Sequence, residues 1–78
     1  MHEVGVAREI LKIALENAKG KKIKNIKVAL AEDGHTTPVS LTDAFALVAK
    51  GTLAEEALLT IQETQELESR VVDLEVEK

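Results

Sequence analysis

The hydrophobic pattern at the start of the chain predicts an amphipathic helix. Its apolar residues recur at spacings of three and four and are Val4, Ala7, Ile10, Leu11, Ala14, Leu15 and Ala18. Because this spacing matches the turn of an α-helix, these side chains fall on one stripe that a core can bury. Gly20 follows the last of them, and a glycine at this point typically ends a helix. We therefore expect a helix that runs to about Ala18.

Three later segments alternate between apolar and other residues, which is typical of β-strands with one buried face. The alternating apolar residues are Ile26, Val28 and Leu30 in the first segment, Leu59 and Ile61 in the second, and Val72, Leu74 and Val76 in the third. Only the polar stretch ETQELES separates the second segment from the third. Because a short connection favours antiparallel neighbours, we expect the last two strands to pair as a hairpin.

A second helix is expected after the turn-rich stretch EDGHTTP. Ser40 can cap its start by accepting a hydrogen bond from the amide of Asp43. The buried stripe of this helix consists of Leu41, Ala44, Phe45 and Val48. Gly51 ends the element, and Thr52 and Glu55 then form a T-x-x-E pattern that indicates one short capped turn.

Together these elements predict an α+β fold in the order α-β-α-β-β, with a small three-stranded mixed sheet and both helices packed on one face. The 78 residues suffice for one domain, 1–78, and no repeat or linker divides them. Phe45 is the only aromatic residue and cysteine is absent, so aliphatic side chains must build the core without disulfides. A core of this size gives only modest stability, and association into a homodimer would add to it. A homodimer is therefore an open alternative to a monomer.

Composition and charge argue against membranes, nucleic acids and catalysis. No apolar run reaches the roughly 18–20 residues of a membrane span and the start lacks the layout of a signal peptide, so we expect a cytoplasmic protein. Residues 1–27 hold seven basic and three acidic side chains, whereas residues 28–78 hold three basic and eleven acidic ones. The basic stretch GKKIKNIK has no aromatic residues to stack on bases. No Ser-His-Asp or Cys-His grouping and no phosphate-binding glycine loop is present, so no enzyme is expected.

The opening MHEVGVAREIL resembles the start of the HypA/HybF nickel-insertion accessory proteins of hydrogenase maturation, whose hallmark is Met-His-Glu followed by an amphipathic helix. Residues 38–61, PVSLTDAFALVAKGTLAEEALLTI, are similar to that family's second helix, its G-T-x-A-E-G-A turn and the strand beyond. The resemblance covers nearly the whole chain. It implies that residues 1–78 form a HypA-like nickel-binding domain.

Two departures from the family pattern stand out. HypA proteins carry a zinc domain with paired C-x-x-C motifs between their last two strands, whereas this chain has only a loop at about 63–70 and no cysteine. The zinc domain is therefore expected to be absent, and no zinc is expected. Glu56 stands where the family usually has glycine. A positive φ at that position would be costly here or is not adopted.

The resemblance implies an accessory protein that offers Ni(II) during maturation of a [NiFe]-hydrogenase or a urease. Its metal residues would be Met1, His2 and Glu3. Its partner would be a nickel-handling GTPase of the hydrogenase maturation pathway or the hydrogenase large subunit. The alternative is a metal-independent protein-interaction module that kept the HypA fold.

Three nitrogen atoms at the start of the chain can chelate one metal ion. The α-amine of Met1, the deprotonated amide nitrogen of His2 and the His2 Nδ1 atom close a five-membered and a six-membered ring. This nitrogen-rich set suits square-planar Ni(II) or Cu(II), so the choice between these two metals stays open. Glu3 can help without bonding the metal, because its charge offsets the repulsion between a cation and the positive end of a helix.

His35 is the candidate for the fourth ligand position. A first helix of some fifteen residues spans about 22 Å, and an antiparallel return strand from Ile23 to Ala31 spans about 27–30 Å. The loop after that strand carries Asp33 and His35 and should therefore lie near the start of the chain. The alternative interpretation is a solvent-exposed turn histidine, which the neighbouring Asp and Gly favour.

Overall fold

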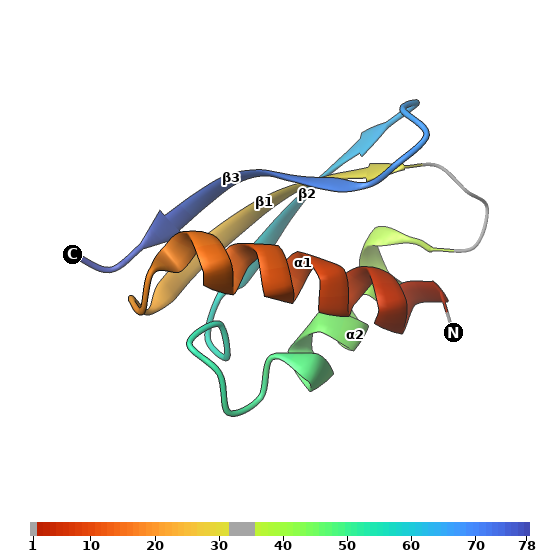
Figure 1. The fold of residues 1–78 in the computed structure, drawn as a ribbon. Helices are drawn as coiled ribbons and strands as arrows, with labels where there is room; N and C mark the ends of the chain where they lie inside the picture. The colour runs from red at the N-terminus through yellow and green to blue at the C-terminus, as the bar shows by residue number, and fades with distance from the viewer. Residues whose placement is uncertain (1, 32–35) are drawn as a thin grey trace.

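The computed structural model describes residues 2–31 and 36–78, with only the backbone described at His2 and Glu3. Its elements are helix α1 (His2–Ala18), strand β1 (Ile23–Ala31), helix α2 (Pro38–Val48), strand β2 (Leu58–Thr64) and strand β3 (Arg70–Val76) (Figure 1). The predicted α+β class and element order are confirmed. Within the described residues, neither helix combines the length and the apolar character needed to span a bilayer.

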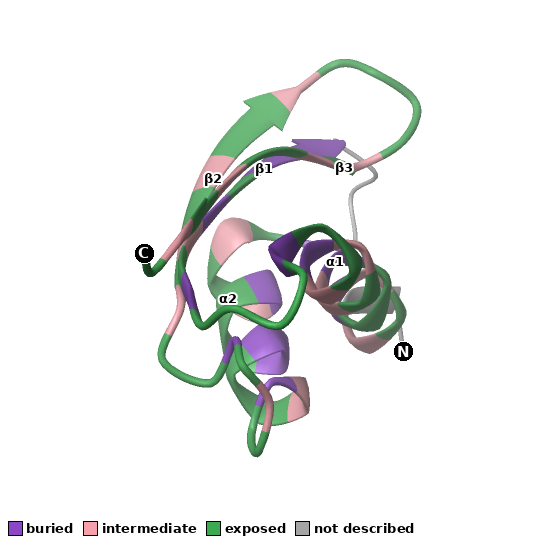
Figure 2. Ribbon diagram, turned by 60° about the vertical axis from the view of Figure 1, so that its left-hand side comes forward, coloured by how far each residue is buried: buried purple, intermediate pink, exposed green. Residues whose placement is uncertain are grey.

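The sheet is mixed, as predicted, with the strand order β2-β1-β3. β1 runs parallel to β2, in a register that places Asn25 opposite Leu58 and Ala31 opposite Thr64, and antiparallel to β3. The parallel pair follows from the connection between its strands, because α2 carries the chain from the end of β1 back to the start of β2. Both helices cover the same face of the sheet (Figures 1 and 2).

The expected hairpin between the last two strands is wrong, because β1 lies between β2 and β3. Residues 28–31 of β1 are all buried. A strand with such a continuous buried run is more stable at the centre of a sheet than at its edge, because strands on both sides cover it. β2 and β3 contain only exposed and half-buried residues and take the two edges. The connection 65–69 therefore passes the end of β1, where the Ser69 hydroxyl accepts a hydrogen bond from the Ala31 amide at 2.8 Å.

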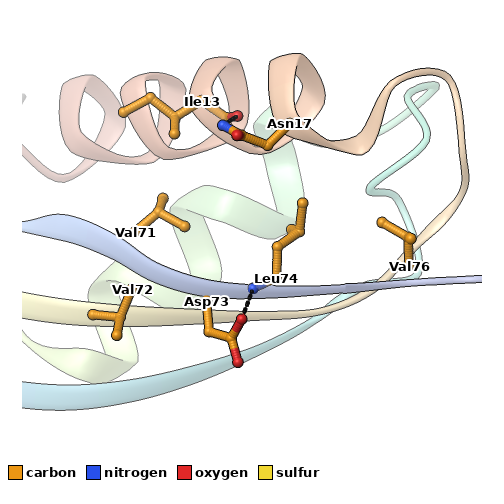
Figure 3. A pocket seen from close by; sticks show the side chains of 7 residues that line it. All are labelled: Ile13, Asn17, Val71, Val72, Asp73, Leu74 and Val76. Atoms are coloured by element: carbon orange, nitrogen blue, oxygen red, sulfur yellow. Dashed lines mark hydrogen bonds between the residues drawn. The ribbon is translucent and has the colours of Figure 1, made fainter.

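A β-bulge in β3 changes which of its side chains face the helices. Val28 of β1 pairs with Val71 whereas the adjacent Lys27 pairs with Asp73, so Val72 is an extra residue on β3. Figure 3 shows Val71 pointing toward α1 and Val72 pointing away from it. Val72 is 47% exposed. The expectation that Val72 shares the buried face of its strand is wrong, because the regular alternation breaks at the bulge.

Helix α2 begins at Pro38, two residues before the predicted start. Its N-cap is Thr37 and not Ser40: the Thr37 hydroxyl accepts a hydrogen bond from the Ser40 amide at 3.1 Å, and the Ser40 hydroxyl accepts one from the Thr37 amide at 2.9 Å. Pro38 favours this start because its fixed φ suits the first helical position and it has no N–H to leave unpaired. The buried residues of α2 are Leu41, Ala44 and Phe45, as predicted, whereas Val48 is half-buried.

The core lies between the two helices and the sheet and consists almost wholly of aliphatic side chains. Its largest fully buried side chains are Ile23, Ile26, Val28 and Leu41. The buried residues of α1 include Ala7, Ala14 and Ala18, whose small side chains let the helix pack closely. As predicted, α1 ends at Ala18. Lys19 and Gly20 follow with φ values of 53° and 84°, the left-handed conformation that ends many helices.

Candidate metal centre

The beginning of α1, the end of β1 and the beginning of α2 lie at one end of the molecule (Figure 1). A groove of about 570 Å³ connects the first two of these elements. Gly5 and Val6, near the start of α1, line this groove together with Ala31, the last residue of β1. The return strand therefore brings the chain back to the start of the first helix, as the lengths of the two elements predicted.

The connection between β2 and β3 forms another wall of this groove. Leu67, Glu68 and Ser69 line it, and Leu67 is 98% exposed. The predicted hairpin of the last two strands would have left this loop at the rim of the sheet, away from the start of α1. The loop reaches α1 because β3 pairs with β1, whose end lies beside the helix start.

The charges that line the groove are mostly acidic. Glu9 and Glu68 are both exposed there. The one basic side chain in the lining, Arg70, forms an ion pair with Glu66 at 3.1 Å. The groove therefore offers a negative field to a cation bound near the start of α1. That field is modest in strength, because exposed charges are screened by water and salt.

The predicted metal residues fall at the limit of what the structure describes. Met1 and His35 lie outside the described residues. The backbone of His2 and Glu3 forms the first turn of α1, and the side chains of these two residues are not described. Among the described side chains, no group of three or more His, Cys, Asp or Glu could hold a metal ion. The described part of the chain thus offers no competing site of that kind.

Glu56, one of the two departures from the family pattern, has a structural role at the start of β1. Its carboxylate accepts a hydrogen bond from the Lys22 ammonium at 2.7 Å. This hydrogen bond raises the pKa of Lys22 and lowers the pKa of Glu56. Glu56 is not among the described residues with positive φ, so the strained conformation is not adopted. In the same turn the Glu55 carboxylate accepts a hydrogen bond from the Gly51 amide at 3.2 Å.

Comparison with known proteins decides the family. The family model described as "Hydrogenase/urease nickel incorporation, metallochaperone, hypA" matches residues 1–69. The chain belongs to the HypA family. This confirms the resemblance that the Met-His-Glu start and residues 38–61 predicted. The HypA family is described as one of metallochaperones rather than enzymes, in agreement with the expectation from the sequence, and nickel is its cargo.

Curated HypA proteins align with most of this chain. The hydrogenase maturation factor HypA of Geotalea daltonii is 32% identical over 62 residues, which cover 80% of this chain and 56% of that protein. The hydrogenase maturation factor HypA of Crocosphaera subtropica is 31% identical over 65 residues, which cover 83% of this chain and 57% of that protein. The chain thus spans about half the length of the curated relatives it matches.

Solved structures show that the fold is shared with HypA proteins. The solution structure of the Ni metallochaperone HypA from Helicobacter pylori matches with a TM-score of 0.80 and 19% identity, covering 95% of this chain and 96% of that one. A second solution structure of a HypA protein matches with a TM-score of 0.76, also at 19% identity, covering 97% and 96% of the two chains. At this identity the likeness establishes the arrangement of helices and strands.

Proposed function

We propose that this HypA-family chain binds one Ni(II) ion at its start and offers it during maturation of a [NiFe]-hydrogenase or a urease. The ligands are the α-amine of Met1, the amide nitrogen of His2 and the His2 Nδ1 atom. One observation supports this proposal most: α1 begins at His2, directly after the residue that supplies the amine. Family membership supplies the cargo, because the HypA family is described by nickel incorporation.

The position of His2 leaves its amide nitrogen available to a metal. The first amides of an α-helix have no carbonyl partner within the helix, and His2 is the first residue of α1. Replacing the amide proton by a metal ion therefore costs the helix no hydrogen bond. The amide of a histidine one turn further along would donate to a carbonyl of the helix, so metal binding at that amide would break a hydrogen bond.

A cation at this position meets the positive end of the α1 dipole, and acidic residues offset that repulsion. Glu3 lies in the first turn of the helix, and Glu9 and Glu68 line the adjoining groove. Glu3→Gln should weaken nickel binding by about twofold to fivefold, the range expected for one charge near an exposed helix end. Glu16→Gln, a matched change in the last turns of α1, should leave the affinity unchanged.

We also propose that His35 completes or assists the site. It directly precedes Thr36, and the segment 32–35 leaves β1 at Ala31, which lines the groove beside Gly5. The end of β1 and the beginning of α2, which flank this segment in the sequence, lie at the end of the molecule where α1 begins (Figure 1). A solvent-exposed turn histidine is the competing interpretation.

Titration of Ni(II) into His2→Ala and His35→Ala variants tests these assignments separately. We expect His2→Ala to weaken nickel binding strongly, because it removes the imidazole ligand and with it the six-membered ring of the chelate. An unchanged affinity and absorption spectrum for His35→Ala would remove His35 from the site. Binding should fall below about pH 6–7, because the amine and the imidazole must lose protons to bind the metal.

The second candidate function is a metal-independent interaction module. It is favoured by Leu67, an apolar side chain that is 98% exposed on the short connection between β2 and β3. In either case we propose a nickel-handling GTPase or the hydrogenase large subunit as partner, and no zinc site within these 78 residues. A folded chain that binds no nickel through Met1 and His2 would favour the module.

A further inference from the structure

The two edges of the sheet differ in how well they are protected against further strand pairing. Among the described residues, β2 and β3 each pair only with β1, so each presents one free edge. A free edge carries unpaired N–H and C=O groups and can pair with a strand of another chain unless the sequence prevents it.

β3 carries the usual protection. Its bulge at Val72 interrupts the regular spacing of its backbone groups. Arg70, Asp73 and Glu75 place charged side chains along its exposed side. Bulges and charges are both features that discourage the addition of a strand. The β3 edge is therefore a poor place for a partner.

β2 has neither protection. Its sequence LLTIQET pairs with β1 in one uninterrupted register and contains a single charged residue, Glu63. Leu58, the first residue of the strand, is 72% exposed. The β2 edge is thus regular, nearly uncharged and partly apolar.

An open groove of about 380 Å³ lies between β2 and α2. Leu59 and Ile61, the side chains of β2 that pack against the core, line one wall and are only half-buried. Val39 and Asp43 of α2 line the other wall; Val39 is 72% exposed, and the Asp43 carboxylate is exposed to solvent. The groove therefore runs along the unprotected edge and has room for apolar side chains from an added strand.

We propose that the occupant is a second copy of this chain, whose β2 pairs antiparallel with β2 across a two-fold axis at Thr60. In this register Leu59 lies opposite Ile61 of the second copy, and Thr60 lies opposite its own counterpart. Leu58 lies opposite Gln62 of the second copy on the other face. The apolar side chains of the second copy enter the groove beside Val39, and the two three-stranded sheets become one continuous sheet.

The sequence of the edge is self-complementary in this register, as a two-fold interface requires. Glu63 falls opposite Ala57 of the second copy, beyond the paired strands, so the charged residues of the two β2 strands do not face each other. Moving the axis by one residue, to Ile61, would place Glu63 opposite Leu59 and put a carboxylate into the apolar groove. The Thr60 register avoids that cost.

Sedimentation velocity over a range of protein concentrations tests the proposal. We expect the unmodified chain to form a dimer as its concentration rises. Thr60→Lys places two ammonium groups opposite each other and should weaken the dimer about tenfold or more. Val72→Lys adds the same charge to an exposed position on the other edge strand and should leave the dissociation constant unchanged. Circular dichroism of both variants checks that they fold.

Charge reversal at the axis gives the sharpest outcome. Thr60→Glu alone should weaken the dimer as Thr60→Lys does, and an equimolar mixture of the two variants should restore a dimer with one copy of each. Three results would overturn the proposal: a monomeric unmodified chain at every concentration, a dimer that Thr60→Lys leaves intact, or equal weakening by Val72→Lys. If the unmodified chain is monomeric at every concentration, the partner of the β2 edge would instead be an extended segment of a different protein.

Discussion

Replacing Thr37 with alanine tests where α2 begins and how its start is held. The Thr37 hydroxyl accepts a hydrogen bond from the Ser40 amide at 3.1 Å, an amide that has no carbonyl partner within the helix. Loss of a threonine N-cap typically costs about 1 kcal/mol of the free energy of unfolding, within about 0.5–2 kcal/mol. For a domain of 78 residues this corresponds to a fall in Tm of about 4–8 °C.

Ser40→Ala removes the other half of the same capping box. The Ser40 hydroxyl accepts from the Thr37 amide at 2.9 Å and donates to the Thr37 carbonyl at 3.1 Å. These bonds are exposed, and alanine is the better helix former, so we expect a smaller loss of about 0.5 kcal/mol. Because the two residues share their hydrogen bonds, the double variant should lose less than the sum of the single variants.

Urea unfolding followed by circular dichroism measures these differences. Thr42→Ala is the matched control, because its hydroxyl only donates to the Pro38 carbonyl within the helix at 2.8 Å. We expect its free energy of unfolding to change by no more than about 0.5 kcal/mol. If Ser40→Ala costs more than Thr37→Ala, the helix starts at Ser40 and the capping box is refuted.

Three further changes test the core, the end of α1 and the ion pair. Ile26→Ala, at a side chain with 0% exposure, should cost about 2–5 kcal/mol, comparable to the whole stability of so small a core, so urea titration should find the variant largely unfolded. Lys19→Gly should raise the free energy of unfolding by about 1 kcal/mol, because φ at Lys19 is 53°, whereas Lys21→Gly should not. The lowered pKa of Glu56 means that its pairing with Lys22 stabilises the fold above the ordinary carboxyl pKa and is lost as the pH falls through the lowered value. The Tm of Glu56→Gln should therefore depend less on pH in that acidic window, and an unchanged profile would contradict the pairing.

The local elements of the fold could be predicted from the sequence because they depend on near neighbours. The stripe of α1 and the glycine after it fix that helix within one turn, and Lys19 and Gly20 adopt the conformation expected at its end. The sequence pattern predicts too late a start for α2, because Ser40 by itself has the features of an N-cap residue. Thr37-Pro38 is the stronger start, since proline suits the first helical position.

The strand order could not be obtained from the length of a connection. ETQELES is short enough for a hairpin turn. Placing the continuous apolar run 28–31 between two neighbouring strands nevertheless stabilises the sheet more than a local turn does. That run was visible in the sequence and indicates a central strand. The bulge at Val72 had no comparable local pattern, because it results from fitting β3 to the register of β1.

The candidate site likewise has one part that could be predicted from the sequence and one part that could not. The Met-His-Glu start could be proposed from chelate chemistry and family resemblance, because its ligands are adjacent in sequence. The groove beside it could not, because Leu67 and Glu68 reach the start of α1 only through the pairing of β3 with β1. That the first strand ends near the start of the chain could be predicted from the lengths of the first helix and strand alone, and Ala31 and Gly5 line the same groove.

Equilibrium dialysis against micromolar Ni(II) tests the nickel proposal most directly, with the chain prepared once with a free α-amine at Met1 and once acetylated there. We predict that the free form binds about one ion per chain and that acetylation weakens binding strongly, because the acetyl group turns a ligand amine into an amide. Equal capture by both forms, or no capture by the free form, would contradict the chelate formed by Met1 and His2.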